Sequence, residues 1–168
     1  MFLTSSYYVK PAFSDGLFQD QLSASVGERK IGLFIKTTPR VVTRDIKKGQ
    51  NPRVEFRIFN SSNNGTYFHV TYHISIEKGG QTLLNEWFHH HYGDLKLEIN
   101  PKSTTRTIIY AQKDPVLDMY TGTLDTPVVV EGQIFLNGGL YHFKVRVLTL
   151  DDDTLVLPPD QQTVYEVR

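Results

Sequence analysis

Alternation of apolar and polar residues along several short segments constrains the fold most strongly. Val54, Phe56 and Ile58 fall on one face of residues 53–59, and charged residues lie between them. The same period of two recurs in three sets: Phe68, Val70, Tyr72, Ile74 and Ile76; Leu95, Leu97 and Ile99; and Tyr141, Phe143, Val145 and Val147. Strands with one apolar and one polar face are typical of antiparallel sheets that bury one side.

Short strands are predicted along almost the whole chain. They span residues 18–26, 30–37, 53–59, 67–77, 82–90, 95–99, 105–111, 128–136, 140–149 and 163–167. No segment has the apolar periodicity of a helix. The pattern predicts an all-β fold, an antiparallel immunoglobulin-like β-sandwich, without the Cys, Trp and Cys spacing of antibody domains. We expect a single sandwich domain over residues 17–168 that follows an N-terminal arm over residues 1–16.

Turn residues separate these strands. Residues 137–139, Asn-Gly-Gly, predict a tight hairpin, since a type I′ turn needs positive φ at both central positions. Residues 79–80, Gly-Gly, predict a second hairpin. Residues 60–66 form a longer polar connection, in which Asn60 and Asn64 each begin an Asn-x-Ser/Thr sequon. Both asparagines are candidate N-glycosylation sites, and the alternative is that they are simply turn residues.

The composition is that of a folded protein and excludes several function classes. Hydrophobic residues make up 39% and charged residues 21% of 168 residues, which argues against disorder. Lys plus Arg equals Asp plus Glu, at 18 each, so the chain lacks the charge expected of a protein that binds nucleic acid or an anionic membrane. The absence of cysteine excludes disulfides and thiolate metal sites.

The sequence contains neither a recognisable export signal nor a known catalytic motif. No apolar run approaches the roughly 20 residues that cross a bilayer, and residues 1–6 lack the basic start and apolar region of a signal peptide. Either the protein is cytosolic, or the sequence is the mature or trimmed part of an exported protein. No nucleophile elbow, HExxH, P-loop or dinucleotide fingerprint is present, which favours a binding or structural module over an enzyme.

Three consecutive histidines are the main candidates for a chemical site. His89 and His91 lie about 6.6 Å apart on one face of a strand, and His90 points to the other face. A turn at residues 92–93 would bring Asp94 back to the same rim. Two imidazoles and a carboxylate suit Zn²⁺ or Cu²⁺. The alternative is a polar strand end with three solvated histidines.

Hairpin pairing brings a fourth histidine to this rim. If residues 67–77 pair with residues 82–90, opposed positions sum to about 159, and His69 lies across from His90 or its neighbours. His73 then lies mid-strand as a surface residue. The candidate metal ligands are His69, His89, His90, His91 and Asp94. The Asp-Asp-Asp run at 151–153 is interpreted as an acidic turn, since a calcium loop spaces its ligands and includes Gly.

Several runs resemble a known group of proteins. Residues 72–80 fit Tyr-x-Ile-x-Ile-x-Lys-x-Gly, and residues 88–95 fit Phe-x-x-His-x-Gly-Asp-Leu. Both patterns resemble uncharacterised exported or membrane-anchored β-sandwich proteins of ammonia-oxidising archaea, over roughly residues 28–100. The positions that carry over are Phe88, His91, Gly93 and Asp94. The resemblance implies a surface location in a copper-rich redox environment, and no activity.

These observations predict an extracytoplasmic binding or structural module that is not an enzyme. We expect a protein partner, no nucleic acid, and membrane contact only through an anchor that lies outside this chain. The alternative is a copper- or zinc-binding accessory protein that uses the turn between His89 and Asp94. A third hypothesis is a catalytic domain whose residues the sequence does not pair.

Overall fold

The structure is a computed structural model that describes residues 19–26, 29–38, 51–159, 162 and 164–167. The predicted arm at residues 1–16 lies outside the described residues. Within the described part, the strands are β1 (Gln19–Val26), β2 (Arg29–Thr38), β3 (Arg53–Asn60), β4 (Val70–Lys78), β5 (Gln81–His90), β6 (Asp94–Pro101), β7 (Ile108–Tyr110), β8 (Gln112–Asp114), β9 (Met119–Gly122), β10 (Val128–Gly132), β11 (Tyr141–Thr149) and β12 (Val164–Val167). In these same ranges, no helix is long and apolar enough to cross a membrane.

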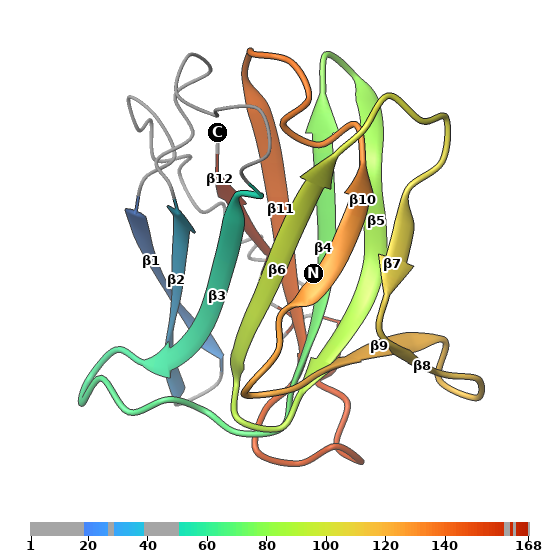
Figure 1. Ribbon diagram of the computed structural model, residues 1–168. Coiled ribbons are helices and arrows are strands. Elements are labelled where there is room, and N and C mark those ends of the chain that lie inside the picture. The colour runs from blue at the N-terminus through green and yellow to red at the C-terminus, as the bar shows by residue number, and fades with distance from the viewer. Residues whose placement is uncertain (1–18, 27–28, 39–50, 160–161, 163, 168) are drawn as a thin grey trace, which may run out of the picture.

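Two six-stranded sheets pack face to face as a sandwich (Figure 1). One sheet has the order β1-β2-β3-β6-β10-β7, and the other has the order β12-β11-β4-β5-β9-β8. The all-β sandwich is therefore confirmed. The expectation of wholly antiparallel sheets is wrong for two pairs, because β10 runs parallel to β6 and β9 runs parallel to β5. Alternation along a strand reports which face is buried and is silent on the direction of the neighbouring strand.

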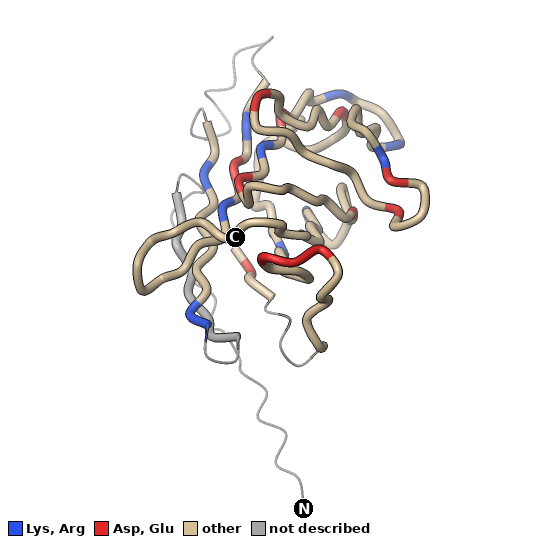
Figure 2. The backbone as a smooth tube through the Cα atoms, turned by 90° about the horizontal axis from the view of Figure 1, so that it is seen from below, with Lys and Arg blue, Asp and Glu red and all other residues tan. Residues whose placement is uncertain are grey.

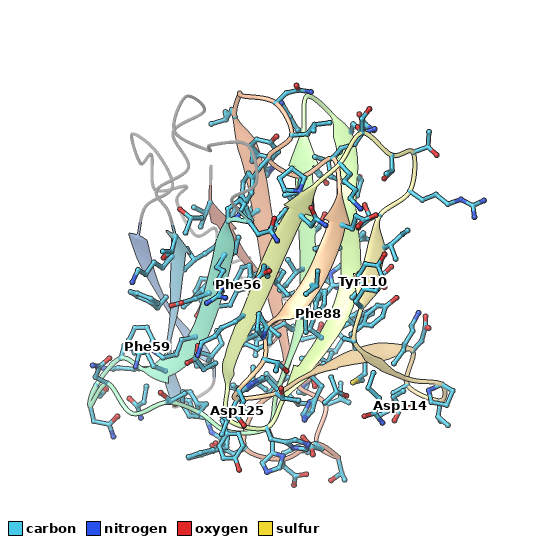
Figure 3. All side chains as sticks on the ribbon, in the orientation of Figure 1. Phe56, Phe59, Phe88, Tyr110, Asp114 and Asp125 are labelled. Carbon is cyan, nitrogen blue, oxygen red and sulfur yellow. The ribbon has the colours of Figure 1, made fainter. Side chains whose placement is uncertain are left out.

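The apolar phases of the strands form the core between the sheets. Phe56, Tyr72, Ile74, Leu97 and Phe143 are all fully buried, as the alternation predicts. Figure 3 labels Phe56 and Phe88, which come from opposite sheets, at the middle of the sandwich.

Phe68 departs from the predicted pattern, because it is 51% exposed whereas its neighbour Tyr67 is buried. His69 has a φ of 47° and interrupts the extended backbone, so the alternation of β4 begins only at Val70.

One of the two predicted tight hairpins is present. Gly79 and Gly80 have φ angles of 56° and 81°, as the turn between β4 and β5 requires. Residues 137–139 do not close a hairpin, because β10 and β11 belong to different sheets. The predicted strand at 128–136 ends at Gly132, and Ile134 and Phe135 are buried where the chain crosses from one sheet to the other.

One end of the sandwich collects the start of β4, the end of β5 and the end of β11. Thr71 pairs with His89 on one side and with Thr149 on the other. The short β8–β9 hairpin joins the same end through the parallel pairing of β9 with β5, and it projects at the lower right of Figure 1. Figure 2 views this end from below and marks its acidic residues in red. Segments far apart in the sequence thus meet here.

Candidate metal centre

A register shift in the β4–β5 hairpin sets the positions of the histidines. Lys78 pairs with Gln81, but a bulge after Ile76 moves the rest of the pairing by one residue. As a result, His69 lies beside His91 rather than His90, and its N–H donates to the His91 carbonyl at 2.8 Å. Directly opposed residues in an antiparallel pair share a face. His69 and His91 therefore project from the same face as His89, which lies opposite Thr71.

Asp153 completes the group from the loop after β11. Its Oδ2 lies 3.0 Å from His69 Nδ1, and its Oδ1 lies 3.2 Å from His89 Nε2. His91 Nδ1 lies 3.2 Å from His69 Nδ1 and 3.4 Å from His89 Nε2. One ligand atom from each of the four side chains falls within 4.8 Å of all the others. We call His69, His89, His91 and Asp153 the His3Asp cluster.

The spacing of these atoms suits a small divalent ion. Zinc–nitrogen bonds of about 2.0–2.1 Å in a tetrahedral site place neighbouring ligand atoms about 3.3 Å apart. The two contacts between histidine nitrogens measure 3.2 and 3.4 Å, and the two carboxylate oxygens of Asp153 lie 3.0 Å from His69 and 3.2 Å from His89. The His3Asp cluster could therefore hold a metal ion.

The buried member of the cluster is held by hydroxyl groups. His89 Nδ1 lies 3.0 Å from Thr71 Oγ1, which is hydrogen-bonded to Thr149 Oγ1 at 2.8 Å. When Nδ1–H donates to Thr71, the Nε2 lone pair points into the cluster and is available to a metal. Burial lowers the pKa of His89, and the nearby His91 and His69 lower it further, against the opposing effect of Asp153. The neutral imidazole that a metal requires is thus favoured at neutral pH.

The three aspartates after β11 have separate roles. Asp151 accepts the Phe68 N–H at 3.1 Å, and its own N–H donates to the Phe68 carbonyl at 2.7 Å. Asp152 caps the next turn by accepting the N–H and the hydroxyl of Thr154. These contacts leave Asp153 facing the histidines, so the run is more than the acidic turn that its sequence predicts.

Two of the sequence-based candidates lie away from the cluster. His90 points to the opposite face of β5, is fully buried, and its Nδ1 accepts the N–H groups of Tyr92 and Asp94 at 3.3 and 3.2 Å. Gly93, with a φ of 66°, turns the chain as expected. The turn leads into the other sheet, however, where Asp94 starts β6 and its carboxylate lies 3.7 Å from Lys96 Nζ. The structure therefore brings Asp153 to the histidines in place of His90 and Asp94.

The other candidate residues lie elsewhere. Asn60 ends β3 and Asn64 lies on the connection to β4, where residues 61–65 are exposed; Asn60 Oδ1 accepts the Ser62 N–H. His73 is half-buried in mid-strand and packs on Trp87, with ring centroids 4.4 Å apart.

A pocket of about 420 Å³ adjoins the cluster. His89, His91 and Asp153 line one side of it. The remaining wall combines apolar and polar side chains from the β4–β5 and β8–β9 hairpins, β11 and the loop after β11. Its apolar residues are Trp87, Leu117, Met119, Leu148 and Val156, and its polar residues are Thr71, Asp114, Thr121 and Thr149. The cluster is therefore open to a cavity on one face.

Comparison with family models, with curated proteins and with solved structures found no match for this chain.

Proposed function

We propose that this protein binds one transition-metal ion, Zn²⁺ or Cu²⁺, through His69, His89, His91 and Asp153. The observation that carries the proposal is the convergence of four side chains from three separate segments, with their ligand atoms within 4.8 Å. Imidazole nitrogens suit zinc and copper, and one carboxylate adds charge neutralisation. Calcium and magnesium are disfavoured because they prefer oxygen ligands.

The hydrogen bonds around the cluster also favour a metal ligand over a solvated surface histidine. His89 is 8% exposed, and its Nδ1 is engaged by Thr71. Metal-binding histidines usually donate the second ring N–H to a fixed acceptor, which orients the ring. Burial and the facing His91 and His69 rings lower the pKa of His89, which favours the neutral, metal-ligating form of that imidazole.

Calorimetric titration of the untagged protein with Zn²⁺ and Cu²⁺ tests the proposal. We expect saturable binding of one ion per chain, and a higher melting temperature with metal, because the ion binds the folded state. Replacing His89 and His91 together by Ala should abolish both effects, whereas His142→Ala, outside the cluster, should change neither. Absence of saturable heat with either metal would overturn the proposal.

We also propose that the module is non-catalytic, works outside the cytoplasm and engages a protein partner. Support comes from the resemblance to exported archaeal sandwich proteins and from two sequons on an exposed connection. The packing of two mostly antiparallel sheets supports an immunoglobulin-like relationship. Protease accessibility of the protein on intact source cells tests the location: protection from protease in intact cells would contradict it.

A further inference from the structure

The pocket beside the His3Asp cluster borders one defined face of it. His89, His91 and Asp153 line the pocket, whereas His69 does not. A metal held by all four side chains would therefore present the His89–His91–Asp153 face to the cavity. Zinc can expand to five ligands and Cu²⁺ in tetragonal sites keeps open positions, so a ligand atom can approach from this face. This step rests on the proposed function.

Apolar side chains on the wall of the pocket are exposed to solvent. Leu117 on the β8–β9 turn is 61% exposed, and Val156 on the loop after β11 is 55% exposed. Met119, Leu148 and Trp87 also line the pocket. Exposed apolar side chains around a concavity mark a binding surface, and about 420 Å³ lies in the range of small-molecule sites. This part of the pocket would therefore suit the apolar body of a ligand.

The net charge of the metal-loaded cluster favours a ligand with a negatively charged head group. A divalent ion with Asp153 as its one carboxylate ligand keeps a formal charge of about +1, which matches a monoanion. Asp114 also lines the pocket, and its Oδ1 accepts the N–H groups of Leu117 and Val116 at 2.9 and 2.8 Å. These bonds lower the pKa of Asp114, so the pocket wall carries a negative charge, which disfavours a dianion more than a monoanion. Asp114 is labelled on the hairpin in Figure 3.

We propose that the pocket binds a small monocarboxylate with an apolar aromatic or branched body. The carboxylate completes the metal coordination on the His89–His91–Asp153 face, and the body packs against Leu117 and Met119.

The test uses 3-phenylpropionate as the probe, titrated calorimetrically into the full chain with and without one equivalent of Zn²⁺. Acetate supplies the same head without the body, and 3-phenylpropionamide supplies the same body without the charge. We expect the zinc-loaded protein to bind 3-phenylpropionate at least about tenfold more tightly than either control compound, because head and body contribute together. The metal-free protein should show no comparable binding.

Two neighbouring positions on the β8–β9 turn give a matched pair of variants. Leu117→Ser removes apolar surface from the pocket and should weaken 3-phenylpropionate binding about fivefold to tenfold, with zinc binding unchanged. Val116 is 87% exposed and does not line the pocket, so Val116→Ser should leave both unchanged. Three results would refute the carboxylate site and leave the metal site standing. In each of them zinc binds, but 3-phenylpropionate fails to bind, binds equally well without zinc, or binds equally well to Leu117→Ser. If zinc itself fails to bind, both proposals fall.

Discussion

The hydroxyl oxygen of Thr71 lies 3.0 Å from Nδ1 of His89, between two strands that pair antiparallel. This hydrogen bond holds the ring of His89 through Nδ1, and Nε2 is the nitrogen that faces His91 and Asp153. Among the described residues, the hydrogen bonds of the Thr71 hydroxyl go to His89 and Thr149, so we expect Thr71 to act on a metal through the orientation of His89.

Thr71→Val tests this positioning role. The variant keeps the shape of the side chain but removes the hydroxyl group that is hydrogen-bonded to His89 Nδ1. We expect zinc affinity to fall about tenfold to 100-fold, as for other outer-shell partners of ligating histidines. Thr71→Ser retains the hydroxyl and should restore most of the affinity. Equal zinc affinity in the valine variant and the natural protein, measured by calorimetry, would show that the hydroxyl does not orient the ligand.

His90 is predicted to stabilise the turn after β5 rather than to bind metal. Its Nδ1 accepts two backbone N–H groups, and the ring is fully buried. His90→Phe leaves both donors without this acceptor and should lower the free energy of unfolding by about 1–3 kcal/mol. His90→Asn keeps an acceptor and should cost less. Both variants should still bind one zinc ion per chain. Loss of zinc binding in His90→Asn would show that His90 is a metal ligand.

The sequence predicts the β4–β5 hairpin because two glycines and two alternating segments lie next to each other in the chain. It misses the register by one residue, because Leu83 is left out of the pairing between Ile76–Leu84 and Glu77–Thr82; the adjacent buried Leu83 and Leu84, which break the alternation, are the only trace of this bulge in the sequence of β5. Asp153 escapes prediction for a different reason. Its position depends on the pairing of β11 with β4, which joins Thr149 to Thr71 without a connecting turn. The parallel pairings of β9 with β5 and of β10 with β6 likewise join strands that are far apart in the sequence.

Two phenylalanines that the alternation treats alike should differ in their effect on stability. Phe56 is fully buried, whereas Phe68 is 51% exposed and contacts Tyr92 edge-on. We expect Phe56→Ala to lower the free energy of unfolding by about 3–5 kcal/mol, because it removes a large core side chain. Phe68→Ala should cost less than about 1 kcal/mol. Chemical denaturation checks both values, and a loss below about 1 kcal/mol for Phe56→Ala would contradict the core assignment.

The stability of the metal-free protein should fall on mild acidification. Burial lowers the pKa of His73, His89 and His90 below the ordinary value. The unfolded chain therefore binds more protons than the folded one as the pH falls below about 6.5, which stabilises the unfolded state. The melting temperature should accordingly decrease from pH 7.5 to pH 5.5. A melting temperature that rises over this interval would mean that these histidines are stabilised in their charged form.

Calorimetric titration of Zn²⁺ into Asp153→Asn, beside Asp94→Asn as the matched control, tests the central claim most directly. Both variants replace a carboxylate by an amide near the histidines, but only Asp153 lies within 4.8 Å of the imidazole ligand atoms. The natural protein and Asp94→Asn should bind one ion with equal affinity, and Asp153→Asn should bind it at least about tenfold more weakly, because one charged ligand is lost. Undiminished binding in Asp153→Asn, or loss of binding in Asp94→Asn alone, would contradict the His3Asp centre.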